Sequence, residues 1–217
     1  MDFISKIIQD YADKHTAVEP EILYELNRYT HLNVLKPRML SGHFQGRFLS
    51  FISKLKQPKY ILDIGTYTGY SALALAEGLR KDGTLFTLDN NEELQAISNK
   101  FFHQSDYNLH IKPILGDAIE SIIELNKTID AWDLIWIDAD KSQYLEYYKL
   151  CIDKLKVGGI MLVDNVLWSG KVAVESEIIN DKDTKSLHEF NVFIQNDSRV
   201  ENVLLPVRDG IMMLIKI

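Results

Sequence analysis

The sequence contains little cysteine and no long apolar run. Cys151 is the only cysteine in 217 residues, so the chain cannot form an internal disulfide, and this suits a reducing cytoplasm. Its setting, "YYKLCIDKL", favours a buried thiol on a helix over a nucleophile. No apolar stretch approaches the roughly 20 residues of a membrane-spanning helix. The opening "MDFISKIIQDYADKH" resembles an amphipathic helix rather than a signal peptide, so we expect a soluble, cytoplasmic protein.

Basic residues are also few, with 24 Lys and Arg against 31 Asp and Glu. The formal charge of −7 argues against a general binder of nucleic acid or acidic membranes. The six histidines are scattered, so no His/Cys cluster indicates zinc. Length and the absence of repeats or Gly/Ser-rich linkers predict one domain over residues 1–217, with a helical cap at 1–55 and a core at 58–217.

Strand-like and helix-like segments alternate through the core. The predicted strands are residues 60–65, 84–89, 110–115, 132–138 and 158–165. The predicted helices are residues 2–14, 20–32 and 42–55 in the cap, and 70–81, 91–102, 117–125, 142–155 and 183–196 in the core. This order predicts an α/β fold with a mostly parallel sheet covered by helices on both faces. The runs 200–207 and 210–217, around "RDG", predict an antiparallel hairpin at the end of the sheet.

All five predicted core strands end in acids or amides. They occur in Asp63-Ile64-Gly65, Asp89, Gly116-Asp117, Asp138-Ala139-Asp140 and Asp164-Asn165. In open α/β sheets, ligands bind at the carboxyl ends of the strands. We therefore expect the functional site at this edge.

The first strand leads into "LDIGTYTGYS", with Gly65 and Gly69 spaced G-x-x-x-G. A dinucleotide site would have G-x-G-x-x-G, so the turn favours a smaller, less anionic cofactor and disfavours an NAD(P)-dependent oxidoreductase. The alternative is a strand-to-helix turn that needs glycine for its conformation alone. Asp89 lies 24 residues after Gly65, where an acid can accept hydrogen bonds from ribose hydroxyls.

The motif "WIDADK" places Asp138, Asp140 and Lys141 after a buried strand. Acids at this point can cap a following helix and suit its dipole. That interpretation fits Asp140 better than Asp138, which is nearest to the strand end.

Five linked motifs carry a family resemblance: "LDIGTYTGYSALALAEGL", "GDA", "WIDADKSQYLEYY", "VGGIMLVDNVLWSGKV" and "LLPVRDGIMM". From about Met39 to the C-terminus, the chain resembles the cation-dependent O-methyltransferases. This S-adenosylmethionine-dependent family contains catechol and caffeoyl-coenzyme A O-methyltransferases and their bacterial relatives. The resemblance implies a Rossmann-like, seven-stranded methyltransferase fold with a reversed hairpin strand, and a homodimer.

The resemblance also implies residue roles. Asp138, Asp164 and Asn165 match metal ligands, and these hard oxygen ligands suit Mg²⁺, or Mn²⁺ or Ca²⁺. Lys141 matches a catalytic lysine beside the acceptor oxygen, and Trp168 matches a wall of the acceptor pocket unless it serves packing alone. The residues matching the cofactor site are Met39, Ser41, Asp63, Gly65, Tyr67, Gly69, Ser71, Asp89, Asp117, Ala118 and Asp138.

Departures from the plant members of the family bear on the acceptor. "GHFQGRFL" replaces an acidic stretch, Arg208 stands where plant members carry a small residue, and the loop at 171–190 has few basic residues to hold a coenzyme A phosphate. A small catechol-type phenol is therefore favoured over a coenzyme A ester. The intact set of Asp138, Lys141, Asp164 and Asn165 disfavours a non-catalytic binder of S-adenosylmethionine. The N-terminal helices are expected to cover the acceptor pocket or to contact a second subunit.

Overall fold

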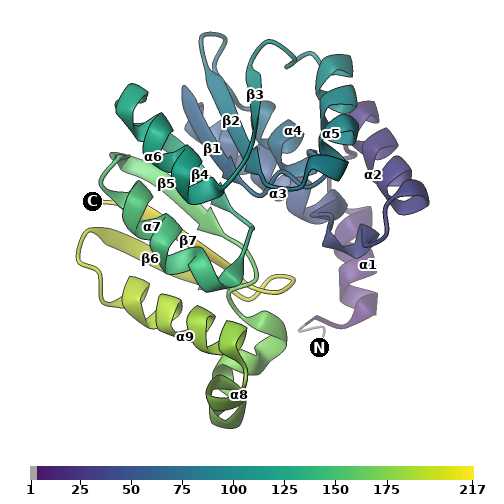
Figure 1. Cartoon of the computed structure of the whole chain (residues 1–217). Coiled ribbons are helices and arrows are strands. Elements are labelled where there is room, and N and C mark those ends of the chain that lie inside the picture. Colours follow the sequence, from purple (N-terminus) through teal and green to yellow (C-terminus); the bar gives the residue numbers. More distant parts are fainter. Residues whose placement is uncertain (1–3) are drawn as a thin grey trace. The chain divides into compact units, whose positions relative to one another are not determined.

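The computed structural model describes residues 4–217 (Figure 1), so the first residues of the predicted 2–14 helix lie outside the described part. By its contacts the chain divides into two compact units. The N-terminal unit is Asp10–Ser121, and the C-terminal unit is Ile122–Ile217 together with the residues up to Gln9. The predicted single domain stays a prediction. Within residues 4–217 the strands form a seven-stranded sheet in the order β3-β2-β1-β4-β5-β7-β6, which confirms the predicted fold class.

The N-terminal unit contains three parallel strands. They are β1 (Tyr60–Ile64), β2 (Thr84–Asp89) and β3 (Ile111–Leu115). Ile61 pairs with Leu85, which in turn pairs with Ile111, and all three are buried because helices cover the strands. The helices with residues in this unit are α1 (Lys6–Lys14), α2 (Glu21–Asn33), η1 (Pro37–Met39), α3 (Gly42–Lys56), α4 (Tyr70–Ala76), α5 (Glu92–Gln104) and α6 (Ala118–Thr128).

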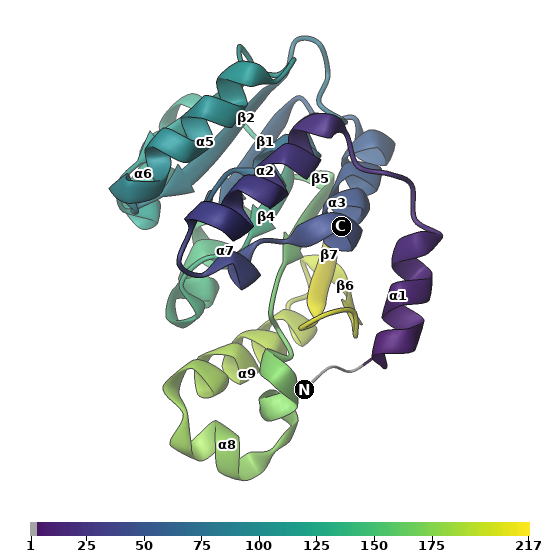
Figure 2. The ribbon, with the colours of Figure 1, turned by 90° about the vertical axis from the view of Figure 1, so that its right-hand side faces the viewer.

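The α4 helix ends at Ala76, five residues earlier than the predicted 70–81 helix. The helix α3 packs against α4, and α2 contacts α4. α2 also contacts α5 (Figure 2). At Gly78 a side-chain Cβ would lie 2.1 Å from the backbone carbon of Ser53 in α3. Glycine commonly follows the last turn of a helix, so Gly78 marks this end in the sequence, and its close approach to α3, beside the Glu77–Arg47 bond, fixes it there.

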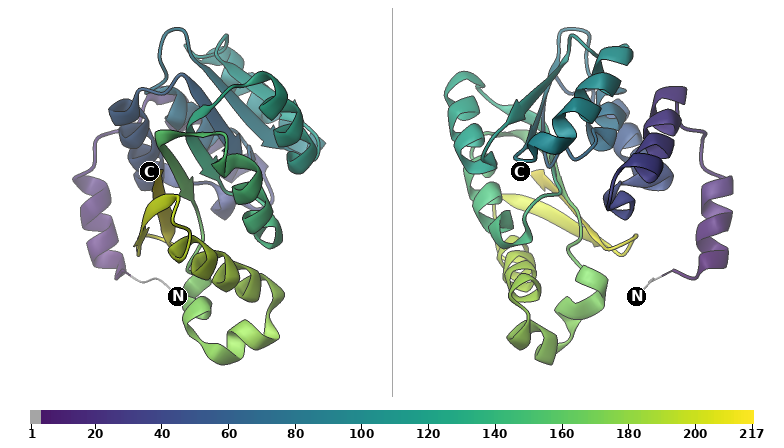
Figure 3. Two further views of the ribbon diagram at one scale, coloured as in Figure 1. Left: turned by 90° about the vertical axis from the view of Figure 1, so that its left-hand side faces the viewer. Right: turned by 45° about the vertical axis from the view of Figure 1, so that its right-hand side comes forward.

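The C-terminal unit contains β4 (Trp132–Ile137) and β5 (Leu155–Val163) in parallel, and the antiparallel strands β6 (Val200–Leu205) and β7 (Ile211–Lys216). β7 pairs with β5, so the predicted hairpin is confirmed. Its helices are η2 (Lys141–Gln143), α7 (Tyr144–Ile152), η3 (Trp168–Ala173), α8 (Glu175–Asn180) and α9 (Lys182–Gln195). The expected loop at 171–190 is wrong in part, because η3, α8 and the start of α9 occupy it, and α8 contacts both η3 and α9 (Figure 3).

The predicted 142–155 helix is too long at its C-terminal end. Leu155 is buried and pairs with Trp132, so β5 begins there rather than at residue 158. Cys151 is buried on α7, and burial raises the pKa of its thiol to about 12, which confirms the predicted core thiol. Among the described helices, none is long and apolar enough to cross a membrane.

Candidate functional site

The glycine turn joins β1 to α4. The backbone N–H groups of Gly65 and Thr66 both donate to the carbonyl of Leu88, at 2.9 and 3.0 Å. Gly69 has φ +97°, and an added Cβ would lie 2.6 Å from Cε1 of Phe102. Gly69 is thus required by its conformation and by its packing, so the structural reason for this glycine holds whether or not a cofactor approaches it.

Asp89, at the end of β2, holds the glycine turn. Its Oδ2 accepts the Tyr67 N–H at 2.6 Å, and its Oδ1 accepts the Asn91 N–H at 2.9 Å. Its carbonyl accepts the Gly116 N–H at 2.9 Å. The carboxylate is half-buried, and each oxygen retains a second lone pair that can accept a hydroxyl.

Asp63 lies inside the unit. It is completely buried, and its Oδ2 accepts the Thr87 hydroxyl at 2.6 Å. The Ser71 hydroxyl, also buried, donates to the same carboxylate at 3.2 Å. These bonds tie β1, β2 and α4 together, which explains Asp63 and Ser71 structurally, and their cofactor contacts stay predictions.

The segment that contains Met39 and Ser41 lies near the glycine turn. The Tyr67 hydroxyl donates to the Lys36 carbonyl at 2.9 Å, which joins the turn to this segment. Burial raises the pKa of Tyr67, so its hydroxyl remains a donor at neutral pH. Met39 is 56% exposed, whereas Ser41 is buried.

Asp117 and Ala118 follow β3. Asp117 Oδ1 accepts the Glu120 N–H at 3.0 Å and thus caps the first turn of α6, so its side chain has a local role as well as the predicted one.

In the C-terminal unit, Asp138 and Asp164 follow two paired strands. The Asp164 N–H donates to the Ile137 carbonyl at 2.9 Å, which aligns the ends of β4 and β5. Lys141 Nζ lies 2.9 Å from Asp138 Oδ1, and both side chains are largely buried. Asp140 Oδ1 accepts the Ser142 N–H at 3.0 Å, which confirms Asp140 as a helix cap.

Tyr144 is a site residue that the sequence did not single out. Burial raises the pKa of its hydroxyl well above the usual value, and the charges of Asp138 and Asp164 raise it further. Among the described residues, the hydroxyl has no hydrogen-bond partner of good geometry. Its interaction with the Ala139 backbone lowers the pKa, but burial and the two charges outweigh that effect. The Lys141 Nζ lies 5.2 Å from the centre of the Tyr144 ring. Tyr144 is one of several tyrosines in "SQYLEYY", and no sequence pattern distinguishes it from the others.

Asn165 follows Asp164 with φ +58°, and its backbone N–H donates to Asp164 Oδ1 at 2.8 Å. Its side-chain Nδ2 donates to Asp209 Oδ2 at 3.4 Å, so the amide oxygen is turned away from Asp209. Trp168 is half-buried with φ +47°. Residues 4–217 contain no cluster of three or more His, Cys, Asp and Glu side chains suited to a metal. The predicted ligand set consists of two carboxylates and one amide. Because asparagine is not one of those four residue types, this set does not count as such a cluster.

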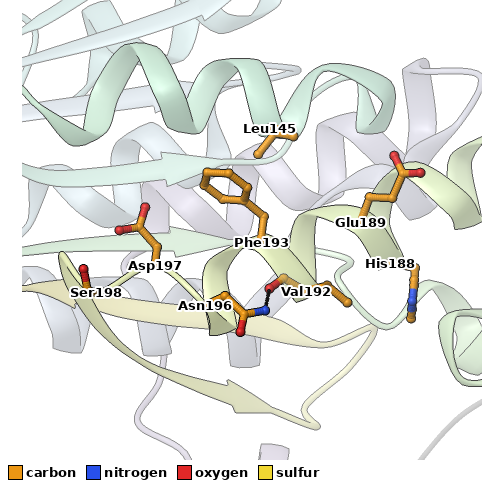
Figure 4. Close-up of a pocket in the computed structure, with 8 residues that line it drawn as sticks. All are labelled: Leu145, His188, Glu189, Val192, Phe193, Asn196, Asp197 and Ser198. Carbon is orange, nitrogen blue, oxygen red and sulfur yellow. Dashed lines mark hydrogen bonds between the residues drawn. The ribbon is translucent and has the colours of Figure 1, made fainter.

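A hollow between α7 and α9 also lies in the C-terminal unit (Figure 4). It is lined by Leu145, His188, Glu189, Val192, Phe193, Asn196, Asp197 and Ser198. It contains none of the predicted site residues, and Asp197 is bonded to Tyr148 and Arg199. The hollow therefore adds nothing to the predicted site.

Comparison with known proteins identifies the family. A family model described as O-methyltransferase matches residues 13–217. Caffeoyl-CoA O-methyltransferase 1 of Nicotiana tabacum is 35% identical over 200 residues, which cover 89% of this chain and 83% of that protein. The corresponding enzyme of Petroselinum crispum is 33% identical with the same coverage.

Solved structures agree. The SAH-bound methyltransferase PaMTH1 of Podospora anserina has a TM-score of 0.86 and 29% identity, with coverage of 97% of this chain and 94% of that chain. A putative O-methyltransferase of Klebsiella pneumoniae has a TM-score of 0.88 and 25% identity, with coverage of 97% and 96%. The resemblance predicted from the sequence is confirmed: the chain belongs to the O-methyltransferase family and is an S-adenosylmethionine-dependent O-methyltransferase.

Proposed function

We propose that this enzyme methylates a hydroxyl of a small catechol-type phenol, with a divalent cation held by Asp138, Asp164 and Asn165. The observation that carries the proposal is the bond from the Asp164 N–H to the Ile137 carbonyl, which brings two acids to neighbouring strand ends. Their charges act together, because both raise the pKa of the Tyr144 hydroxyl.

The ligand set fits a hard cation. Two carboxylates and one amide oxygen leave positions for water and for the acceptor oxygens, as Mg²⁺ sites commonly do. The bond from Asn165 Nδ2 to Asp209 leaves the amide oxygen as the atom available to a cation. When bound, such a cation supplies Lewis acidity that favours ionisation of the acceptor hydroxyl.

Lys141 is the proposed base. Its Nζ already lies beside Asp138, and its side chain is 13% exposed, so it is held near the proposed ligands rather than in solvent. In the proposed reaction the neutral amine of Lys141 takes the proton of the acceptor hydroxyl and becomes an ammonium, and Trp168 forms a wall that orients the ring. Positioning of this kind supplies much of the rate in transfer reactions.

The methyl donor is proposed to occupy the glycine-turn edge of the N-terminal unit. Asp89 accepts from the ribose hydroxyls, using lone pairs that Tyr67 and Asn91 leave open. Gly65, Gly69, Asp117 and Ala118 line the same edge, and Met39 and Ser41 close over the donor. The buried Asp63 and Ser71 shape the edge from behind. Asp138 is also a proposed cofactor residue, as the family resemblance implies.

A coenzyme A ester is the second candidate acceptor, because the curated relatives at 33–35% identity are caffeoyl-CoA O-methyltransferases. Both candidates present vicinal hydroxyls on an aromatic ring. Turnover of labelled methyl donor with Mg²⁺ should be measured for free catechols, their coenzyme A esters and matched monophenols. We expect free catechols to be the best acceptors. Preference for the ester would favour the second candidate, and no transfer to any member would contradict both candidate acceptors.

A homodimer and a cytoplasmic location are part of the same proposal. None of the nine residues of α1 is buried, and Ile7, Ile8 and Tyr11 are 83%, 60% and 65% exposed. An apolar surface of this kind is typical of a covered interface. Sedimentation at micromolar concentration should show a dimer, and a persistent monomer would contradict it.

A further inference from the structure

The loop after β5 has an unusual backbone. Asn165, Trp168 and Ser169 have φ values of +58°, +47° and +56°, and Gly170 has +82°. Non-glycine residues rarely adopt this region, so the surrounding structure must hold the loop in place. This loop contains the proposed amide ligand and the proposed wall of the acceptor pocket.

The tip of the β6–β7 hairpin provides that support. The Leu167 N–H donates to the Asp209 carbonyl at 2.9 Å, and the Val166 N–H donates to the Gly210 carbonyl at 3.1 Å. Gly210 has φ +85°, and an added Cβ would lie 2.5 Å from Leu167 Cγ. The hairpin tip and the loop are therefore in close backbone contact.

The Asp209 carboxylate joins two points of the loop. Its Oδ1 accepts the Ser169 N–H, and its Oδ2 accepts Asn165 Nδ2 at 3.4 Å. A carboxylate has acceptors alone, so it can bond the NH₂ group of Asn165 but not its oxygen. The charge of Asp209 thus selects one of the two orientations of the Asn165 amide.

We propose that Asp209 is a positioning residue that fixes the Asn165 amide with its oxygen toward the cation and holds the Trp168 loop beside it. This inference rests on the proposed metal site. It assigns to the hairpin tip a role in the orientation of a ligand, comparable to the outer-shell partners that orient metal ligands elsewhere.

The first variant is Asp209→Asn, measured by calorimetry of Mn²⁺ binding to the metal-free protein. The new amide has one oxygen for two donors, Ser169 N–H and Asn165 Nδ2, so one bond must be lost. We expect Mn²⁺ affinity to fall about tenfold or more, as for other partners of metal ligands. An affinity within twofold of the native protein would overturn the inference.

The second variant exchanges the two side chains, Asn165→Asp with Asp209→Asn. The amide at position 209 can then donate to the carboxylate at position 165 while its oxygen accepts the Ser169 N–H. The net charge is unchanged. The carboxylate at position 165 remains an oxygen ligand, so we expect the double variant to bind Mn²⁺ at least tenfold more tightly than Asp209→Asn. A double variant no better than Asp209→Asn would contradict the inference, including the case in which the single variant folds poorly.

The matched control is Asn191→Ala. Asn191 Nδ2 donates to the Val166 carbonyl at 2.8 Å, so this variant weakens the same loop without touching the Asn165 amide. We expect a lower melting temperature with Mn²⁺ affinity within twofold, and an equal loss of affinity would reduce Asp209 to general loop support. Absence of Mn²⁺ binding by the native protein would instead overturn the proposed metal site, and the inference with it.

Discussion

Asp89 in the N-terminal unit ends a strand, and Asp138 and Asp164 in the C-terminal unit each directly follow one, yet their partners differ. Asp89 accepts two backbone N–H groups, from Tyr67 and Asn91, and thereby fixes a turn. Asp138 is bonded to a lysine, and together with Asp164 it raises the pKa of the buried Tyr144 hydroxyl.

The difference indicates two uses of the same residue type. A carboxylate that accepts backbone donors shapes the chain and leaves lone pairs for neutral hydroxyls, which suits a ribose. Two carboxylates gathered on paired strand ends concentrate negative charge, which favours a cation. Glu77 shows a further case, since Arg47 and Lys54 supply its cations from within the chain.

The largest effect is expected when one of the two acids at the ends of β4 and β5 is removed. Asp164→Ala should lower turnover about a hundredfold or more at millimolar Mg²⁺, because a ligand is lost, and excess Mg²⁺ should restore part of it. Steady-state rates over a Mg²⁺ titration would check this. Glu175→Ala, which removes an exposed acid from the same unit, is the control. A defect unchanged by Mg²⁺ would contradict the ligand role.

The second prediction distinguishes the role of Lys141 as a base from the role of the metal ligands. Lys141→Ala should lower turnover about a hundredfold at neutral pH while metal and donor affinities stay near native, as expected for general-base catalysis. The loss should shrink as pH rises, because more of the acceptor is then already ionised. Rates from neutral to alkaline pH measure this. A constant loss across that range would leave Lys141 with a positioning role.

A smaller effect is expected in the N-terminal unit, at Asp89. Asp89→Ala should weaken S-adenosylmethionine binding by about 1–2 kcal/mol, through loss of charge-assisted hydrogen bonds and of support for the turn. Calorimetry would measure the affinity, with the exposed Asp106→Ala as a control of equal charge change. Unchanged affinity would remove Asp89 from the donor site.

The last effect is expected at Glu77, an acid whose charge is paired with Arg47 and Lys54 of the same chain. Burial alone would raise the pKa of Glu77, but hydrogen bonds from Arg47, Lys54 and Ser50 lower it below its usual value of 4.5. Glu77→Gln should therefore lower the free energy of unfolding by about 2 kcal/mol at neutral pH. Because the folded pKa is depressed, the difference should shrink as pH falls below about 4.5, as protonation of Glu77 removes the same stabilisation.

Urea denaturation of both proteins at several pH values would measure this difference. An equal difference at pH 7 and at pH 3 would contradict the role of charge and leave Glu77 a packing role.

Much of the fold could be predicted because buried strands and the acids after them are local patterns. The motif "WIDADK" correctly placed Asp138 at a strand end and Asp140 as a cap. What the sequence did not reveal depends on distant contacts. Asp209 meets Asn165 across 44 residues, because β7 returns beside β5. The approach of Gly78 to the backbone of α3 is a second contact of this kind.

Two residues also show where local patterns mislead. Arg208 has φ +52°, a conformation that favours glycine, but nothing in "PVRDG" identifies Arg208 as the left-handed residue. Burial and the charges of Asp138 and Asp164 raise the pKa of the Tyr144 hydroxyl, whereas the Tyr147 and Tyr148 hydroxyls donate to Gln143 and Asp197. The local sequence does not show this difference, because it depends on how α7 packs.

The central claim is that the β4–β5 strand ends hold a cation required for methyl transfer. The most direct test is turnover of a catechol with labelled S-adenosylmethionine, before and after exhaustive chelation and again after Mg²⁺ is returned. We expect chelation to abolish transfer and Mg²⁺ to restore it, with no restoration in Asp164→Ala at the same concentration. Full turnover by the chelated native enzyme would contradict the account.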